Sequence, residues 1–227
     1  MKGTLFVVSL PIGNLKDITL RALETLKEAD LILSEKPKTL LKLLNFYQIK
    51  KPVFKIFEHQ NEKKFEKIFK FLEEGKKLVF VSEAGTPAIS DPGAKLVSLV
   101  RARFGEKVKI VPVPGPSALT CLFSVAGVPS SKFLFFGFLP KKKKRKKVLQ
   151  EVAQSQYPVI FFESPHRILK TLKELEKENS ELEVVVGREL TKMFEEIFVG
   201  KISQAREKFE KGKAKGEFTV LVWQKRK

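Results

Sequence analysis

Three loops that combine glycine, proline and hydroxyl side chains hold the residues best suited to bind a polar ligand. The first, residues 9–15 (SLPIGNL), directly follows an apolar run. The second, residues 81–93 (VSEAGTPAISDPG), offers the hydroxyls of Thr86 and Ser90 and the carboxylate of Asp91 for hydrogen bonds to a ribose or an amino-acid group. Small residues there let a ligand approach the backbone closely. The third, residues 113–118 (VPGPSA), presents free backbone N–H groups at the expected start of a helix.

Each loop also has a purely structural interpretation. The first matches an ordinary turn between a strand and a helix, and taken alone this interpretation is favoured. Asp91 could simply cap the helix that follows Pro92. The proline-rich third loop could be a stiff hinge between domains, although a cleft between domains is also a favoured ligand site. We favour a functional role for the second loop, because a long ordered loop between regular elements usually has one.

Several common catalytic and metal-binding motifs are absent from the sequence. It contains no Gly-x-Gly-x-x-Gly dinucleotide fingerprint, no Gly-x-x-x-x-Gly-Lys-Ser/Thr phosphate loop and no Gly-x-Ser-x-Gly nucleophile elbow. Its only histidines are His59 and His166, which excludes a histidine-rich metal site. The single cysteine, Cys121, excludes a disulfide within the chain and a cysteine-based zinc site. We therefore expect no metal.

The elements that must position these loops alternate between short apolar strands and amphipathic helices, which predicts an α/β protein. Asp17 is expected to cap a first helix that places leucines on one stripe. Three prolines within residues 112–116 cannot lie in a helix or a central strand, so we place a domain boundary there. The predicted domains are residues 1–114 and 115–227. Predicted strands are 4–10, 31–33, 53–57, 78–82, 108–113, 133–138, 159–162, 184–187, 196–199 and 218–223, and predicted helices include 39–46, 62–74, 94–103, 117–126, 146–154, 167–177 and 203–211.

The charge of the chain predicts a polyanionic partner. Lysine and arginine exceed the acidic residues by 18, which creates a long-range field attractive to nucleic acid or an anionic surface. A heat-adapted surface rich in ion pairs would need both signs of charge, so it does not explain the excess alone. Residues 141–147 (KKKKRKK) are seven consecutive basic residues, which we expect to be mobile until a polyanion binds, although such runs are usually just solvated.

The composition and the amino-terminal residues predict a cytoplasmic protein. No apolar run approaches the roughly 20 residues that a membrane-spanning helix needs. The apolar segment 5–11 is too short for the core of a signal peptide and is better explained as a strand.

Seven segments together resemble a known family: "LPIGNLKDITLRALETLKEADLI", "VSEAGTPAISDPG", "VPVPGPSAL", "FFGFLPKK", "FFESPHR", "GRELTKMFEE" and "GEFTVLV". In this order and spacing they resemble the RsmI family of ribosomal RNA ribose methyltransferases, within the wider group of tetrapyrrole methylases. The resemblance covers nearly all of residues 3–223.

The resemblance implies two α/β domains of the tetrapyrrole methylase type, with S-adenosylmethionine in a cleft between them, and a homodimer. It implies 2′-O-methylation of a cytidine ribose in small-subunit (16S) ribosomal RNA. The cofactor contacts that it implies are Leu10, Thr86, Ile89, Ser117, Ala118 and the backbone near Phe162, with residues 216–218 completing the site.

Within this chemistry a base near the 2′ hydroxyl would help to remove its proton. Candidates are Glu163, His166, Glu189 and Glu195, but each has a structural alternative: Glu163 and Arg167 could instead form a salt bridge with Arg188, for example. Arg167 and Arg188 are the better candidates for phosphate contacts, since guanidinium groups match phosphate oxygens. Lys141, Lys144 and Arg145 of the basic run are further candidates for contacts with RNA.

The sequence departs from the family pattern in three places. Residues 34–39 (SEKPKT) stand where Glu-Asp-Thr-Arg is usual, Glu83 stands where Asp is usual, and the small helical domain that commonly follows the last strand is not present in these residues. Two alternatives stay open. One is a methyltransferase of corrinoid precursors on the same scaffold, against which the basic run and the RELTK motif argue. The other is an RNA-binding assembly factor without catalytic activity, which the altered residues 34–39 keep open.

Overall fold

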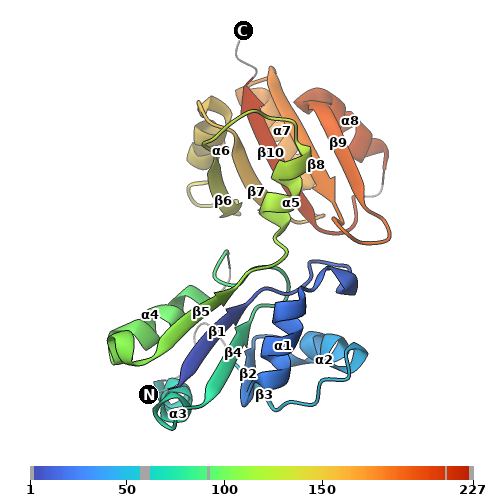
Figure 1. Ribbon diagram of the computed structural model, residues 1–227. Coiled ribbons are helices and arrows are strands. Elements are labelled where there is room, and N and C mark those ends of the chain that lie inside the picture. The colour runs from blue at the N-terminus through green and yellow to red at the C-terminus, as the bar shows by residue number, and fades with distance from the viewer. Residues whose placement is uncertain (1–2, 57–61, 91–92, 213, 225–227) are drawn as a thin grey trace. The chain divides into compact units, whose positions relative to one another are not determined.

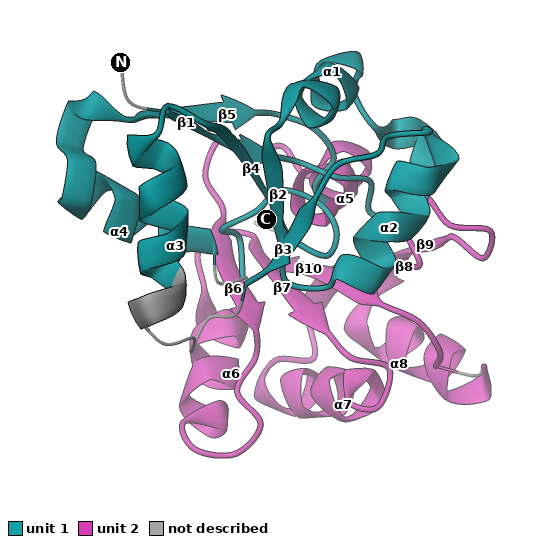
Figure 2. Ribbon diagram, turned by 90° about the horizontal axis from the view of Figure 1, so that it is seen from below, with its two compact units in different colours: residues 1–117 teal, residues 118–227 magenta. Residues whose placement is uncertain are grey.

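The chain forms two compact units, Met1–Ser117 and Ala118–Lys227, each with its own sheet (Figures 1 and 2). The computed structural model describes residues 3–56, 62–90, 93–212 and 214–224. Both units combine helices with a five-stranded sheet, which confirms the predicted α/β class.

Unit 1 is a parallel sheet covered by helices on both faces. Its strand order is β3-β2-β4-β1-β5. Helices α1 and α2 pack against one face and helices α3 and α4 against the other. Strand β1, with the sequence TLFVV, lies near the middle of the sheet, and its apolar side chains pack on both faces. The elements are β1 (Thr4–Val8), α1 (Leu20–Glu28), β2 (Leu31–Ser34), α2 (Pro37–Phe46), β3 (Val53–Lys55), α3 (Glu62–Glu73), β4 (Lys77–Val81), α4 (Gly93–Phe104) and β5 (Lys109–Val113).

The first helix begins at a different residue from the one that we predicted. Thr19 caps α1, since its hydroxyl accepts a hydrogen bond from the backbone N–H of Ala22 at 3.1 Å. The predicted cap, Asp17, instead ends a short 3-10 turn, Leu15–Asp17, which Asn14 caps. The extra turn moves the entry into α1 by two residues, so the prediction for Asp17 was wrong.

Unit 2 is a mixed sheet with the order β6-β7-β10-β8-β9. The last strand, β10, lies in its centre and pairs antiparallel with both β7 and β8. Helices α6, α7 and α8 cover one face. Helix α5 contacts β8 and β10 from the other, where Gly187 leaves room for Leu122. The elements are α5 (Ala118–Val125), β6 (Leu134–Phe138), α6 (Arg145–Gln154), β7 (Val159–Glu163), α7 (Ile168–Glu178), β8 (Leu182–Arg188), β9 (Glu196–Lys201), α8 (Ile202–Lys211) and β10 (Phe218–Gln224).

The basic run is divided between a turn and a helix. Residues 141–144 form turns and bends, and α6 begins already at Arg145, inside the run. Lys144 takes a left-handed conformation with a φ of 65° immediately before the helix. The seven residues are therefore a turn of four exposed lysines followed by the first turn of α6, which begins one residue before the predicted start at residue 146.

Within the described part of the chain, no helix is both long enough and apolar enough to cross a membrane. No group of three or more potential metal ligands occurs among the same residues.

Candidate functional site

The three loops singled out from the sequence meet at one edge of unit 1. They follow β1, β4 and β5, which are neighbouring parallel strands, so their carboxyl ends lie side by side. The connection after β1 leads to α1 on one face of the sheet, and the connection after β4 leads to α4 on the other. Adjacent strands whose connections leave toward opposite faces form the crevice in which α/β sheets bind ligands.

Hydrogen bonds tie the first two loops together at this crevice. The backbone N–H of Leu10 donates to the carbonyl of Gly85 at 3.0 Å, and the N–H of Gly85 donates to the carbonyl of Leu10 at 3.1 Å. The Ser9 hydroxyl donates to the Thr86 hydroxyl oxygen at 3.1 Å. The crevice therefore has a fixed backbone before any ligand arrives.

The third loop joins the other two through Thr86. The Thr86 hydroxyl donates to the carbonyl of Pro116 at 3.1 Å, so this one side chain links all three loops. Gly115 allows close packing at the same place, because an added Cβ would lie only 2.9 Å from the Cβ of Ser9.

The exposed part of the second loop has an unusual backbone. Gly85, Ala88 and Ser90 all have left-handed φ angles, of 71°, 69° and 70°. Such conformations are strained for residues other than glycine and are often found at ligand-binding positions. Ala88, Ile89 and Ser90 are exposed, whereas Gly85 is buried. The loop thus presents Ala88, Ile89 and Ser90 to solvent.

The residues that the resemblance named as cofactor contacts take different positions. Leu10 is buried in the core of unit 1, so only its backbone reaches the crevice. Thr86 lies among the three loops and Ile89 lies on the exposed part of the second. Ser117 is half-buried at the end of unit 1, and Ala118 opens α5 of unit 2. Asp91, whose side chain we proposed as a ligand or helix cap, lies outside the described residues.

Two of the departures from the family pattern contact each other. Lys36 follows β2, Glu83 follows β4, and their side chains form an ion pair. Both side chains are about half exposed. The ion pair therefore links the loop after β2 to the loop after β4.

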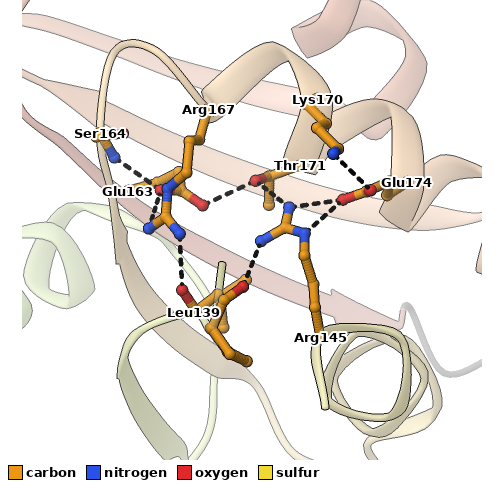
Figure 3. Close-up of polar contacts among 9 residues, drawn as sticks. Leu139, Arg145, Glu163, Ser164, Arg167, Lys170, Thr171 and Glu174 are labelled. Carbon is orange, nitrogen blue, oxygen red and sulfur yellow. Dashed lines mark hydrogen bonds and ion pairs between the residues drawn. The ribbon is translucent and has the colours of Figure 1, made fainter. Parts of the chain in front are cut away.

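In unit 2, Glu163 lies in a buried polar network (Figure 3). One carboxylate oxygen accepts from the backbone N–H of Ser164 at 2.8 Å and pairs with Arg167 at 2.6 Å. The other accepts from the Thr171 hydroxyl at 2.8 Å. Arg167 also donates to the carbonyl of Leu139 at 2.9 Å. Of the two interpretations of Glu163, this geometry favours the internal salt bridge over the base, although the pair does not include Arg188.

The network continues to Arg145, which is buried (Figure 3). Its guanidinium donates to Thr171 at 2.8 Å, to the carbonyl of Pro140 at 3.0 Å, and to Glu174 at 2.6 and 2.8 Å. Its donors face the interior of unit 2 rather than solvent. Lys141 and Lys144, the other candidates for RNA contacts in the basic run, are exposed.

The remaining base and phosphate candidates lie at the end of β8 or in loops. His166 is exposed in the turn before α7. Arg188 lies 3.1 Å from Glu196 and donates to the carbonyl of Lys215 at 3.5 Å. The carboxylate of Glu195 accepts from the backbone N–H of Thr191. Arg188 and Glu163 flank Phe218 of β10 from opposite sides, and each has its own ion-pair partner.

Glu189 is an ionised carboxylate held over the loop before β10. It accepts hydrogen bonds at 2.8 Å from the Lys192 ammonium and from the backbone N–H of Glu217. Partial burial opposes ionisation, but these two hydrogen bonds outweigh it and hold the pKa of Glu189 below its ordinary value. At Gly216, with a φ of 94°, an added Cβ would lie 2.4 Å from the Glu189 side chain, so the carboxylate can take this position only over a glycine.

Sequence reasoning named Arg167 as a possible salt-bridge partner of Glu163 but missed Thr171 and Glu174. Thr171 and Glu174 of α7 follow Arg167, which immediately precedes the helix, at spacings of four and three residues, and this puts all three on one side. That spacing was available in the sequence and could have indicated a buried polar stripe. The contact of Glu189 with Glu217 had no comparable signal, because it joins distant segments.

Comparisons with known proteins give one consistent family. Residues 4–206 match the family model "Tetrapyrrole (Corrin/Porphyrin) Methylases". A protein of Thermotoga maritima named "Ribosomal RNA small subunit methyltransferase I" is 46% identical over 97% of this chain and 98% of its own length. A Bacillus subtilis protein of the same name is 38% identical over 97% of this chain and 75% of its own.

Solved structures of more distant proteins share the fold. Cobalt precorrin-4 methyltransferase CbiF has a TM-score of 0.71 at 20% identity and covers 96% of this chain and 94% of its own. A diphthine synthase also has a TM-score of 0.71, at 17% identity, and covers 98% of this chain and 90% of its own. At such low identity the likeness concerns the fold alone.

Proposed function

Because the chain belongs to the tetrapyrrole (corrin/porphyrin) methylase family, and its relatives over nearly the whole length are named ribosomal RNA small subunit methyltransferase I, we propose that it methylates small-subunit ribosomal RNA. The proposed methyl donor is S-adenosylmethionine, and the proposed acceptor is the 2′ oxygen of a cytidine ribose. The identity of 46% with the Thermotoga protein, over nearly all of both chains, is the observation that carries the proposal.

The carboxyl edge of unit 1 fits this donor by its chemistry. The loops there offer the Thr86 hydroxyl and the exposed residues 88–90. Bound S-adenosylmethionine supplies a methyl group already activated by the sulfonium, so the reaction needs no metal. Residues Leu10, Thr86, Ile89, Ser117, Ala118 and Phe162 remain the proposed contacts. The hydrogen bonds among the three loops would hold the protein groups that contact the donor in place before the donor binds.

The role of the protein in the reaction is mainly to align the two reactants. Holding a hydroxyl in line with an activated methyl group can supply much of the rate enhancement. Of the base candidates, Glu163 and Glu189 are held in internal ion pairs and Glu195 accepts from the backbone N–H of Thr191, whereas His166 is exposed. We therefore retain His166 as the candidate for removing the 2′ proton. Its replacement by alanine should lower kcat for methyl transfer without changing the affinity for the donor.

The proposed RNA contacts are the exposed lysines of the turn, including Lys141 and Lys144. The inward-facing guanidinium groups of Arg145 and Arg167 are better explained as supports for that turn. Arg188, close to Glu196, stays a weaker candidate for a phosphate contact. A homodimer follows from the same resemblance and a cytoplasmic location from the composition, and both remain predictions.

The decisive experiment is to map methylated nucleotides in ribosomal RNA before and after treatment with the purified protein and S-adenosylmethionine. We expect one new 2′-O-methylcytidine in the small-subunit RNA. Corrinoid precursors offered in a parallel reaction test the alternative substrate class. Methylation of those precursors alone, or no heat of binding when S-adenosylmethionine is titrated into the protein, would contradict the proposal.

A further inference from the structure

The end of strand β6 contains a bulge that redirects an aromatic side chain. Phe135 pairs with Ile160 of β7, but Phe138 pairs with Phe162, so β6 contains one residue more than β7 between these pairs. Gly137 takes a left-handed φ of 58° in this interval. Bulges with a left-handed glycine often re-aim a side chain next to a functional site.

The consequence of the bulge is visible in the aromatic contacts. In a regular strand Phe135 and Phe138 would point to opposite faces of the sheet. Instead both rings contact the ring of Phe162, with centroids 5.1 and 5.6 Å away. Phe136, between them, packs against the core under the helices. The bulge therefore takes Phe138 out of the core side and leaves its side chain 58% exposed.

Four exposed lysines follow this phenylalanine after a short fixed spacer. The spacer is Leu139, which is buried, and Pro140. Arg167 donates to the carbonyl of Leu139 at 2.9 Å, and Arg145 donates to the carbonyl of Pro140 at 3.0 Å. Ion pairs hold both guanidinium groups in turn: Arg167 with the buried Glu163, and Arg145 with the half-buried Glu174 (Figure 3). The distance from the exposed ring to the lysine turn is thus set by the core of unit 2.

We propose that residues 138–144 bind one unpaired stretch of the RNA substrate. A base stacks on the ring of Phe138, the lysines at 141–144 hold the adjoining phosphates, and Arg145 and Arg167 position the two parts. Aromatic side chains beside a cationic track are the usual means of binding single-stranded nucleic acid. Paired RNA keeps its bases stacked inside the helix, so only an unpaired base can reach the ring.

The neighbouring charges favour RNA over a protein partner. Lysine is depleted in the cores of protein–protein interfaces, whereas four lysines adjoin Phe138 here. The net charge of +18 points the same way. This inference rests on the proposed function, because that function identifies the polyanion as RNA. It does not depend on methyl transfer.

The test measures the affinity for a fluorescein-labelled single-stranded oligocytidylate by anisotropy over a series of salt concentrations. Phe138→Leu, which keeps an apolar side chain but removes the stacking surface, should weaken binding roughly five- to 100-fold. The slope of affinity against salt should stay unchanged, because the substitution removes no charge. Phe138→Trp should bind at least as tightly as wild type. Phe46→Leu is the matched control, since Phe46 is 59% exposed on α2 of unit 1, and it should bind like wild type.

The inference is overturned if wild type does not bind the oligomer, or if Phe138→Leu binds it as tightly as wild type. An equal loss of affinity for a fully paired RNA duplex would also overturn it, as would capture of a protein partner through Phe138 with no effect on RNA.

The positioning role of Arg167 is tested by a double-mutant cycle. Arg167→Lys keeps the charge but loses the fork that spans Glu163 and the carbonyl of Leu139. It should weaken oligomer binding in the wild-type background and much less in the Phe138→Leu background. The loss of thermal stability should be the same in both backgrounds. Equal effects on affinity in both backgrounds would show that Arg167 does not act through the ring.

Methyl-transfer assays on the same variants separate the two proposals. If Phe138→Leu methylates ribosomal RNA with a wild-type kcat/KM, the stacking inference fails and the proposed function stands. If the protein binds the oligomer through Phe138 but methylates no RNA, the proposed function fails and the stacking inference stands.

Discussion

At the scale of single residues, the contacts of Glu163 and Glu189 favour a structural role over the role of a base, for which both were candidates. Each lies in a segment that resembles the family, and each was a candidate base. Glu163 is buried with both oxygens occupied, and Glu189 is held as an anion by Lys192 and the backbone of Glu217. The lowered pKa of Glu189 makes it a weaker base. Both oxygens of Glu163 already accept hydrogen bonds, so neither is free to take a proton. Both residues are therefore better suited to hold loops in place than to accept a proton.

We expect Glu163→Gln to destabilise unit 2 strongly. Removing one member of a buried ion pair leaves the other charge without compensation, which costs about 3–5 kcal/mol. The measurement is the free energy of unfolding in urea, followed by circular dichroism. Glu66→Gln is the control, because Glu66 forms an exposed pair with Arg103 at 3.4 Å, and its loss should cost at most about 1 kcal/mol. Equal effects of the two changes would contradict the structural role of Glu163.

The lowered pKa of Glu189 predicts how stability depends on pH. The ionised form is favoured in the folded state, so its contribution is present above the pKa of the unfolded chain and is lost as the pH falls through the lower folded pKa. Glu189→Gln should therefore cost about 1–3 kcal/mol at neutral pH, and the difference from wild type should shrink on acidification.

Denaturant titrations at neutral and acidic pH measure this difference. Glu207→Gln is the control, since the Glu207 side chain is 58% exposed and lies 3.8 Å from Arg206, and it should change little at either pH. A Glu189→Gln variant whose deficit is constant across this range would contradict the assignment.

The candidate site could be predicted from sequence only in part. Thr86 and the three loops were singled out by their residue types, and the structure does bring these loops together. The inward orientation of Arg145 was not predictable from a run of seven basic residues, because a run carries no information on which member faces the core. Thr171 and Glu174 supply that information, but only once α7 is placed beside α6.

At the scale of elements, the irregular positions matter more than the regular ones. The predicted strands and helices of both units were largely confirmed, since alternating apolar patterns identify them. The bulge in β6 was not predicted, because a glycine inside an apolar strand has several explanations. The cap of α1 was misassigned for a similar reason: Asp17 and Thr19 are both good capping residues, and only the 3-10 turn decides between them.

The left-handed glycine of the bulge gives a prediction at this scale. Gly137→Ala should cost about 1–2 kcal/mol of stability, the usual penalty of that conformation for a residue with a Cβ. It should also weaken oligomer binding, because the bulge holds Phe138 on its face of the sheet. Gly105→Ala is matched in backbone, with a φ of 54° and open space around the added Cβ. It should lose similar stability in thermal unfolding while binding the oligomer like wild type.

At the scale of the whole molecule, the excess of 18 positive charges makes association with RNA sensitive to salt. Replacing the lysines at 141–144 by glutamine should weaken binding and reduce the slope of log affinity against log salt. The expected reduction is about 0.7 for each phosphate of a single strand that the variant no longer neutralises. Replacing four exposed lysines elsewhere, at 38, 42, 50 and 55 of unit 1, controls for net charge alone. The same reduction of this slope in both variants would show that the lysine turn has no special role in binding RNA.

Proteins with different names share this fold, among them a cobalt precorrin-4 methyltransferase and a diphthine synthase. Substrate choice must therefore lie in local features rather than in the two sheets. The lysine turn and the redirected phenylalanine are such features, and both lie at one end of β6.

The central position of β10 has a consequence for how the protein is made. Residues 218–224 pair with β7 on one side and β8 on the other, so the sheet of unit 2 is divided until they are synthesised. All strands of unit 1 precede residue 114, and that unit can close while translation continues. A nascent chain paused before residue 218 would expose two unpaired strand edges, and it is at this stage that a chaperone would be needed most.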